Sequence, residues 1–104
     1  MVDFEEMLTP RGAYRLEDVS LLVATDKVQF HSLLLGPAGA EVWARAWISD
    51  ENGTLAETAA PSAVAGDQVT IDVATPQSVS GCHAFIRIES KPLETEHVLM
   101  RRLP

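Results

Sequence analysis

An alternation of apolar and polar residues recurs over most of the 104 residues of this chain. Alternation with a period of two is typical of β-strands, because successive side chains point to opposite faces of a sheet. The clearest example is the segment 68–74, in which Val69, Ile71 and Val73 share one face. The pattern predicts strands at residues 19–24, 27–35, 41–49, 54–58, 68–74, 82–89 and 96–103.

Turn-forming residues separate these segments. The pair Asn52-Gly53 accepts a positive φ at low cost, so it predicts a hairpin between segments 41–49 and 54–58. The other breaks carry residues typical of bends and loops. They are Thr25-Asp26, the Gly-Pro-Ala-Gly run 36–39, the soft Ala/Pro/Ser stretch 59–65, Gly66-Asp67, and the bend between Pro76 and Gly81.

Short strands with turn signals at intervals of roughly 8–12 residues predict an all-β, antiparallel β-sandwich of about seven strands. A helical period is conceivable only in the first dozen residues, where Phe4, Met7 and Leu8 line a turn before Pro10. The length fits one domain. We expect a short N-terminal arm or helical turn over residues 1–18 and a β-sandwich over 19–104.

Three stretches, AEVWARAWISDENGTL, VAGDQVTIDV and GCHAFIRIES, resemble the middle and late strands of immunoglobulin-like and fibronectin-type domains. The resemblance covers residues 28–103 and lies in the strand pattern. It implies an immunoglobulin-like sandwich, with Trp43 or Trp47 where such domains keep a core tryptophan. The chain departs from these families because it lacks a cysteine pair and has no tyrosine near Cys82.

Composition and charge restrict the classes of partner and the cell compartment that can be expected. A hydrophobic fraction of 46% with 22% charged residues is that of a globular protein with a core. The net charge of −7 repels nucleic acid and anionic lipid, so neither is expected as a partner. Cys82 has no internal disulfide partner, the N-terminus lacks signal-peptide features, and no apolar run is long enough to span a bilayer. These features favour the cytoplasm, with virion association as an alternative.

The most unusual strands are those that are apolar on both sides. In segment 41–49, alternation places Trp43, Arg45 and Trp47 on one side; in segment 82–89, it places Phe85 and Arg87 together. If the two strands are neighbours, these five residues share one sheet face. Trp and Arg are enriched at the centres of protein interfaces, so the set is a candidate binding platform. The competing interpretation is that the tryptophans face the core or lie under loops.

Possible metal ligands are present but poorly spaced. His31, Cys82, His83, His97 and Met100 invite comparison with copper sites, which gather Cys, His and Met on one short loop. Here 14 residues separate Cys82 from His97. Cys82 also alternates with apolar residues, which is typical of a small buried hydrophobe. No metal site and no cofactor are predicted.

Catalytic motifs are missing from the sequence. It contains no G-x-S-x-G, no phosphate-binding loop and no H-E-x-x-H pattern. The acidic pairs Glu5-Glu6 and Asp50-Glu51 fall in terminal or turn segments and read as solvated charge. We therefore expect no catalytic residues and a protein that is not an enzyme.

Two classes of function remain open. The first is a protein-interaction or assembly module, an accessory or structural subunit such as a virion decoration domain, that docks through the aromatic and arginine face onto a partner or a second copy. The alternative is a carbohydrate or small-molecule binder that uses Trp43 and Trp47. Enzymatic function ranks behind both.

Overall fold

The computed structural model describes residues 4–37, 41–59, 66–75, 78–90 and 92–104. Within these residues every regular element is a strand and every strand pairing is antiparallel, which confirms the predicted all-β class. The strands are β1 (Glu5–Arg11), β2 (Arg15–Val23), β3 (Lys27–Leu35), β4 (Trp43–Asp50), β5 (Gly53–Ala59), β6 (Gln68–Ala74), β7 (His83–Ser90) and β8 (Thr95–Arg102).

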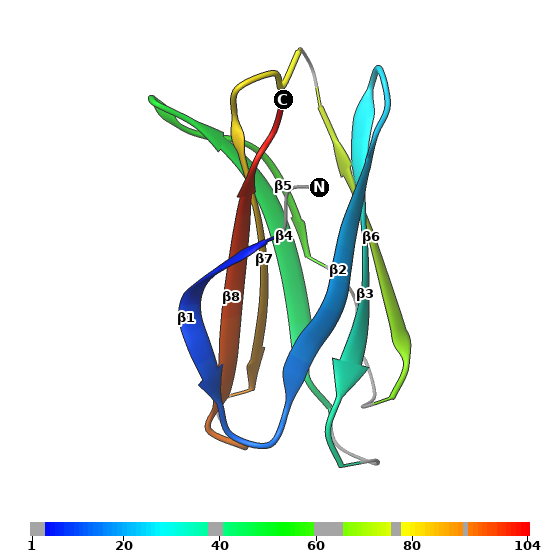
Figure 1. Cartoon of the computed structure of the whole chain (residues 1–104), viewed down its shortest axis with the longest axis vertical. Helices are drawn as coiled ribbons and strands as arrows, with labels where there is room; N and C mark the ends of the chain where they lie inside the picture. Colours follow the sequence, from blue (N-terminus) through cyan, green and yellow to red (C-terminus); the bar gives the residue numbers. More distant parts are fainter. Residues whose placement is uncertain (1–3, 38–40, 60–65, 76–77, 91) are drawn as a thin grey trace.

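The strands form two sheets that pack face to face as a β-sandwich (Figure 1). The large sheet has five strands in the order β1-β8-β7-β4-β5, and the small sheet has three in the order β2-β3-β6. Consecutive strands β4–β5 and β7–β8 form hairpins within the large sheet. β7 also pairs with β4, so segments far apart in sequence become neighbours.

The N-terminal segment differs from expectation, because it forms strand β1 where an arm or helical turn was predicted. β1 pairs with β8 along the edge of the large sheet, from Glu5 opposite Met100 to Arg11 opposite Glu96, with two register shifts between them. All seven of its residues are exposed. This strand therefore forms through backbone pairing with β8, and its sequence has no buried apolar alternation from which it could be predicted.

The core lies between the two inner faces. The two largest fully buried side chains of the core, Phe30 and Leu34, come from β3 of the small sheet. The large sheet offers alanines next to isoleucines, which leaves room for these larger groups in one continuous cluster. Its buried members on β4 and β7 are Ala44, Ala46, Ile48, Ala84, Ile86 and Ile88.

The predicted hairpin between the fourth and fifth strands is confirmed. The Asn52 backbone N–H donates to Oδ1 of Asp50 at 2.7 Å, and Gly53 has a φ of 123°. Arg45 to Asp50 of β4 then pair with the returning strand β5. The soft stretch 60–65, Pro76 and residues 38–39 of the predicted Gly-Pro turn lie outside the described residues.

The chain crosses between sheets at Gly12, just after β1. Gly12 has a φ of 80°, and a Cβ there would collide with Oγ1 of Thr95 and the carbonyl oxygen of Glu94. Thr95 Oγ1 itself donates to the carbonyl of Arg11 at 3.0 Å. Only glycine satisfies both the backbone conformation and this close approach to β8.

Candidate functional site

The outer face of the large sheet carries all five residues that the sequence singled out. Trp47 lies opposite Phe85, and Arg45 lies opposite Arg87, in the β4–β7 register. Their chain neighbours Ala44, Ala46 and Ile48 are buried, so these five side chains point away from the core. Trp43 is 57% exposed. The core tryptophan implied by the family resemblance is therefore wrong, because small alanines and isoleucines fill that side of β4.

An apolar row crosses the middle of this face. The Trp47 and Phe85 rings are stacked, with centroids 5.1 Å apart and planes inclined by 6°. Met100 of β8 follows Phe85 in register. Such a stack contributes about 0.5–1.5 kcal/mol beyond simple burial. We call Trp47, Phe85 and Met100 the aromatic row; Glu57 and Glu5 lie at its two ends in register.

A second row runs beside the first, one step along the strands. It consists of Arg45, Arg87, Val98 and Leu8 in register, and we call it the arginine row. The Arg87 guanidinium forms ion pairs with both Glu89 and Glu96. Among the described residues, Arg45 has no such carboxylate partner, although it lies directly opposite Arg87.

The two ends of the face carry opposite charge. Beyond the aromatic row lie Ser49, His83 and Arg102, which pair across β4, β7 and β8. Beyond the arginine row lie Trp43, Glu89 and Glu96, also in register, with Arg11 of β1 beside Glu96. The face is therefore basic at one end and acidic along β7 and β8 at the other.

Counted over the described residues that pair in register, the outer face is electrically neutral. Its register-paired residues include four acids and four arginines, a net charge of zero, whereas the chain carries −7. The excess negative charge therefore lies elsewhere on the molecule. The eight residues are Glu5, Glu57, Glu89, Glu96, Arg11, Arg45, Arg87 and Arg102.

Sequence reasoning missed the contribution of β8 and β1 to this face. Val98 and Met100 extend the rows from β7, and Leu8 of β1 is 45% exposed beside Val98. A signal was present, because residues 98–100 are three consecutive apolar residues, which indicates a strand with apolar groups on both sides. The pairing of β1 had no comparable signal.

The outer face of the small sheet is different in character. Gln29 Nε2 donates to Oδ1 of Asp72 at 2.7 Å, and His31 Nε2 lies 2.7 Å from Oε1 of Gln29. Lys27 approaches Asp72 at 4.0 Å. Its partly exposed leucines lie opposite polar or charged residues, with Leu33 facing Glu17 and Leu35 facing Arg15. This face reads as solvated surface.

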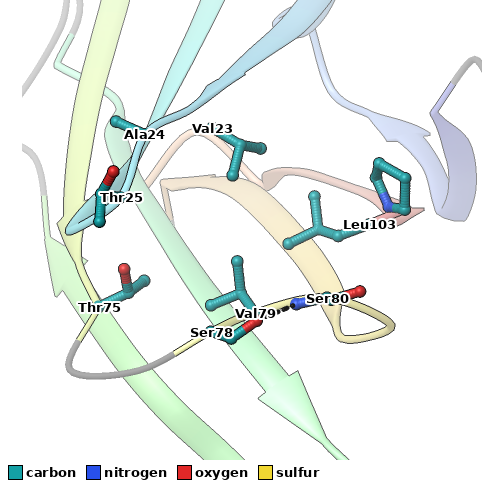
Figure 2. Close-up of a pocket in the computed structure, with 9 residues that line it drawn as sticks. Val23, Ala24, Thr25, Thr75, Ser78, Val79, Ser80 and Leu103 are labelled. Atoms are coloured by element: carbon teal, nitrogen blue, oxygen red, sulfur yellow. Dashed lines mark hydrogen bonds between the residues drawn. The ribbon is translucent and has the colours of Figure 1, made fainter.

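A cleft of about 410 Å³ opens at one end of the sandwich (Figure 2). Val23, Val79 and Leu103 form its apolar part, and the hydroxyls of Thr25 and Thr75 lie at its rim. No residue in its described lining has an ionisable side chain. The described side chains of the lining therefore offer a ligand hydroxyl and apolar groups.

The possible metal ligands are scattered over the fold. His31 lies on the outer face of the small sheet, whereas His83 and Met100 lie on that of the large sheet. Cys82 and His97 are buried. In the part of the chain that the structure describes, no three His, Cys, Asp or Glu residues gather in a way that would hold a metal ion.

His97 is the one buried histidine among the described residues. It is 2% exposed, and its Nδ1 accepts a hydrogen bond from the Leu16 backbone N–H at 3.0 Å. Its Nε2 lies 3.4 Å from Oε1 of Glu6. Burial lowers the pKa of His97 below 6.5, and Glu6 partly opposes this shift. His97 thus links the two sheets as a neutral acceptor.

Comparisons with protein-family models, with curated proteins and with solved structures found no match to this chain. Among the described residues there is also no helix of the length and apolarity required to cross a membrane.

Proposed function

We propose that this protein is a non-catalytic interaction or assembly module, an accessory or structural subunit that docks onto a protein through the outer face of its large sheet. The observation that carries the proposal is that this face combines the stacked aromatic row with the arginine row and has zero net charge on a chain of −7. Interface centres are enriched in aromatic residues, Met and Arg and depleted in other charged residues.

The contacts indicate where binding energy would arise. Trp43 is 57% exposed, and its burial by a partner would remove a large apolar surface from water. Arg45 has no carboxylate partner among the described residues and can engage an aromatic ring or carboxylate of the partner. Arg87 is held by Glu89 and Glu96, so it enters the interface preorganised.

Carbohydrate binding through Trp43 and Trp47 has weaker support. Sugar binding of this kind uses the free faces of aromatic rings, and the Trp47 ring has Phe85 stacked on one of its faces. Only Trp43, among the two, offers a widely exposed indole.

We further propose that the sandwich is of the immunoglobulin-like or fibronectin type. In such domains strand F lies between strands C and G of one sheet, and here β7 lies between β4 and β8. The long connection that returns β7 beside β4 is of the Greek-key kind. β1 adds a further strand beside β8.

Site-specific photo-crosslinking tests the proposed function. A photoreactive phenylalanine analogue replaces Trp43 in the cells that naturally express the protein, and the matched control carries it at Thr70 on the outer face of the small sheet. We expect position 43, and not position 70, to yield a discrete crosslinked protein that mass spectrometry identifies. Equal background at both positions in a folded protein would refute the proposal.

The carbohydrate alternative has its own readout. Tryptophan fluorescence of the purified chain is titrated with a panel of pyranose sugars. A saturable change that Trp43→Ala abolishes, with no crosslinked protein at position 43, would replace the interaction proposal by carbohydrate binding.

A further inference from the structure

The outer face of the large sheet is complementary to itself, and its rows show how. Rotation by 180° about an axis that lies in the plane of the face and crosses the strands brings each strand over its own counterpart, reversed in direction. If the axis passes between the aromatic row and the arginine row, each row meets the other row of the second copy. Two-fold dimers require this property, because each copy supplies the same surface.

The central contacts match in kind under this rotation. Arg45 faces Trp47 of the second copy, and Arg87 faces Phe85 of the second copy, from their shared positions on β4 and β7. The Trp47 and Phe85 rings each use one face in their mutual stack, so a guanidinium of the second copy would contact the ring face that remains open. Each of these pairs occurs twice in a two-fold dimer. On β8, Met100 meets Val98 of the second copy, whereas the pair on β1, Leu8 with Glu5 of the second copy, is not matched in kind.

The ends of the face match as well. His83 and Arg102 at the basic end face Glu89 and Glu96 of the second copy at the acidic end, along β7 and β8 respectively. On β4, the exposed indole of Trp43 faces the small side chain of Ser49. A parallel superposition would place like charges together, so the charge pattern selects the two-fold arrangement.

The neutrality of the face removes the main objection to self-association of an acidic chain. Contact between two neutral faces brings no net like charge into the interface, although each chain carries −7. Twisted sheets that pack face to face keep their strand directions within about 30°, which is compatible with the antiparallel superposition described here.

We infer that the partner of this face is a second copy of the chain, bound through a two-fold axis between the aromatic and arginine rows. This inference rests on the proposed function, since it names the partner of the same face.

A reciprocal charge exchange tests the axis directly. Arg102→Glu opposes Glu96 of the second copy, and Glu96→Lys opposes Arg102 of the second copy, so each variant repels itself. In an equimolar mixture both contacts become attractive. We expect light scattering to report twice 11.3 kDa for the wild type, monomers for each variant, and a restored dimer for the mixture.

Lys27→Glu is the matched control, because it changes the net charge as much as Arg102→Glu but lies on the small sheet. We expect Lys27→Glu to remain dimeric. Circular dichroism verifies the fold of each variant, since Glu96→Lys also removes a partner of Arg87. If Glu96→Lys unfolds, His83→Glu opposes Glu89 of the second copy along β7, and its mixture with Glu89→Lys tests the rescue. Only His83→Glu is then expected to be monomeric by itself, because His83 is counted as neutral.

Three results would overturn the inference: a monomeric wild type at all concentrations, equal dissociation by Lys27→Glu, or a mixture that stays monomeric. A monomeric wild type together with a crosslink from position 43 to a different protein would reject the second copy and leave the proposed function intact. Absence of any crosslink from that position would reject both.

Discussion

Nδ1 of His97 accepts a hydrogen bond from the backbone N–H of Leu16 at 3.0 Å, and this contact joins β8 of the large sheet to β2 of the small sheet. Protonation of Nδ1 would make it a donor, and it would then face the Leu16 N–H, which is also a donor. His97 is 2% exposed, so little water is available to relieve the conflict. The facing charged groups are Glu6 on β1, which favours the protonated form, and Arg15 on β2, which opposes it.

We expect stability to fall as the pH drops below neutrality. Burial lowers the pKa of His97 in the folded protein below its ordinary 6.5, so the unfolded chain takes up the proton first. The contribution of His97 is therefore fully present above pH 6.5 and is lost as the pH falls from 6.5 toward the lower pKa of the folded state. Urea unfolding at several pH values between about 7.5 and 5.5, which bracket the ordinary pKa of histidine, measures the slope of the unfolding free energy against pH. A His97→Gln variant with an unchanged slope would contradict this assignment.

The two tryptophans of β4 should differ in their effect on stability. Trp47→Ala removes the stack with Phe85 and its partial burial, so we expect a loss of about 1–3 kcal/mol with the fold retained. Trp43→Ala should change the free energy of unfolding by no more than about 0.5 kcal/mol, because the residue is 57% exposed. Denaturant titration compares the two. A larger loss for Trp43→Ala would place that residue in the core.

Phe30 is the largest fully buried side chain of the small sheet, at 0% exposure. Phe30→Ala should cost about 3–5 kcal/mol through lost burial and the cavity left behind. Because domains of this size have only about 5–15 kcal/mol of stability, this variant should be close to unfolding. Phe30→Leu, the conservative control, should lose much less. Thermal unfolding by circular dichroism ranks the variants, and similar losses for both would contradict tight packing at this site.

Gly12 and Gly66 separate backbone strain from steric collision. Both have positive φ, at 80° and 87°, but a Cβ at Gly12 meets Thr95 and Glu94, whereas one at Gly66 meets nothing within 4 Å. Gly66→Ala should cost about 1–2 kcal/mol from the left-handed backbone alone. Gly12→Ala should cost distinctly more, since β1 and β8 must separate to admit the methyl group. Equal losses in urea titrations of the two variants would show that the crossing at Gly12 is not tightly packed.

Two kinds of information account for what could be predicted here. Alternation within a strand is local, so the sequence alone grouped Trp43, Arg45 and Trp47 on one side of β4 and Phe85 with Arg87 on one side of β7. The Asn52-Gly53 hairpin is equally local, because its backbone conformation depends on the residues of the turn themselves. Strand β1 was not predicted because all its residues are exposed, so they show no buried apolar alternation. The strand forms through backbone hydrogen bonds to β8.

Local sequence patterns were enough to predict the class of the fold, most strand segments and which residues share a side of each strand. Which side of a strand faces water depends instead on how the two sheets pack together. Phe30 and Leu34 on β3 require small or branched residues opposite them, and Ala44, Ala46 and Ile48 satisfy that need where two indoles would overfill the space. The tryptophans therefore lie outside. The neutral, two-ended charge pattern arises in the same way, because it combines residues from five strands whose order no local pattern encodes.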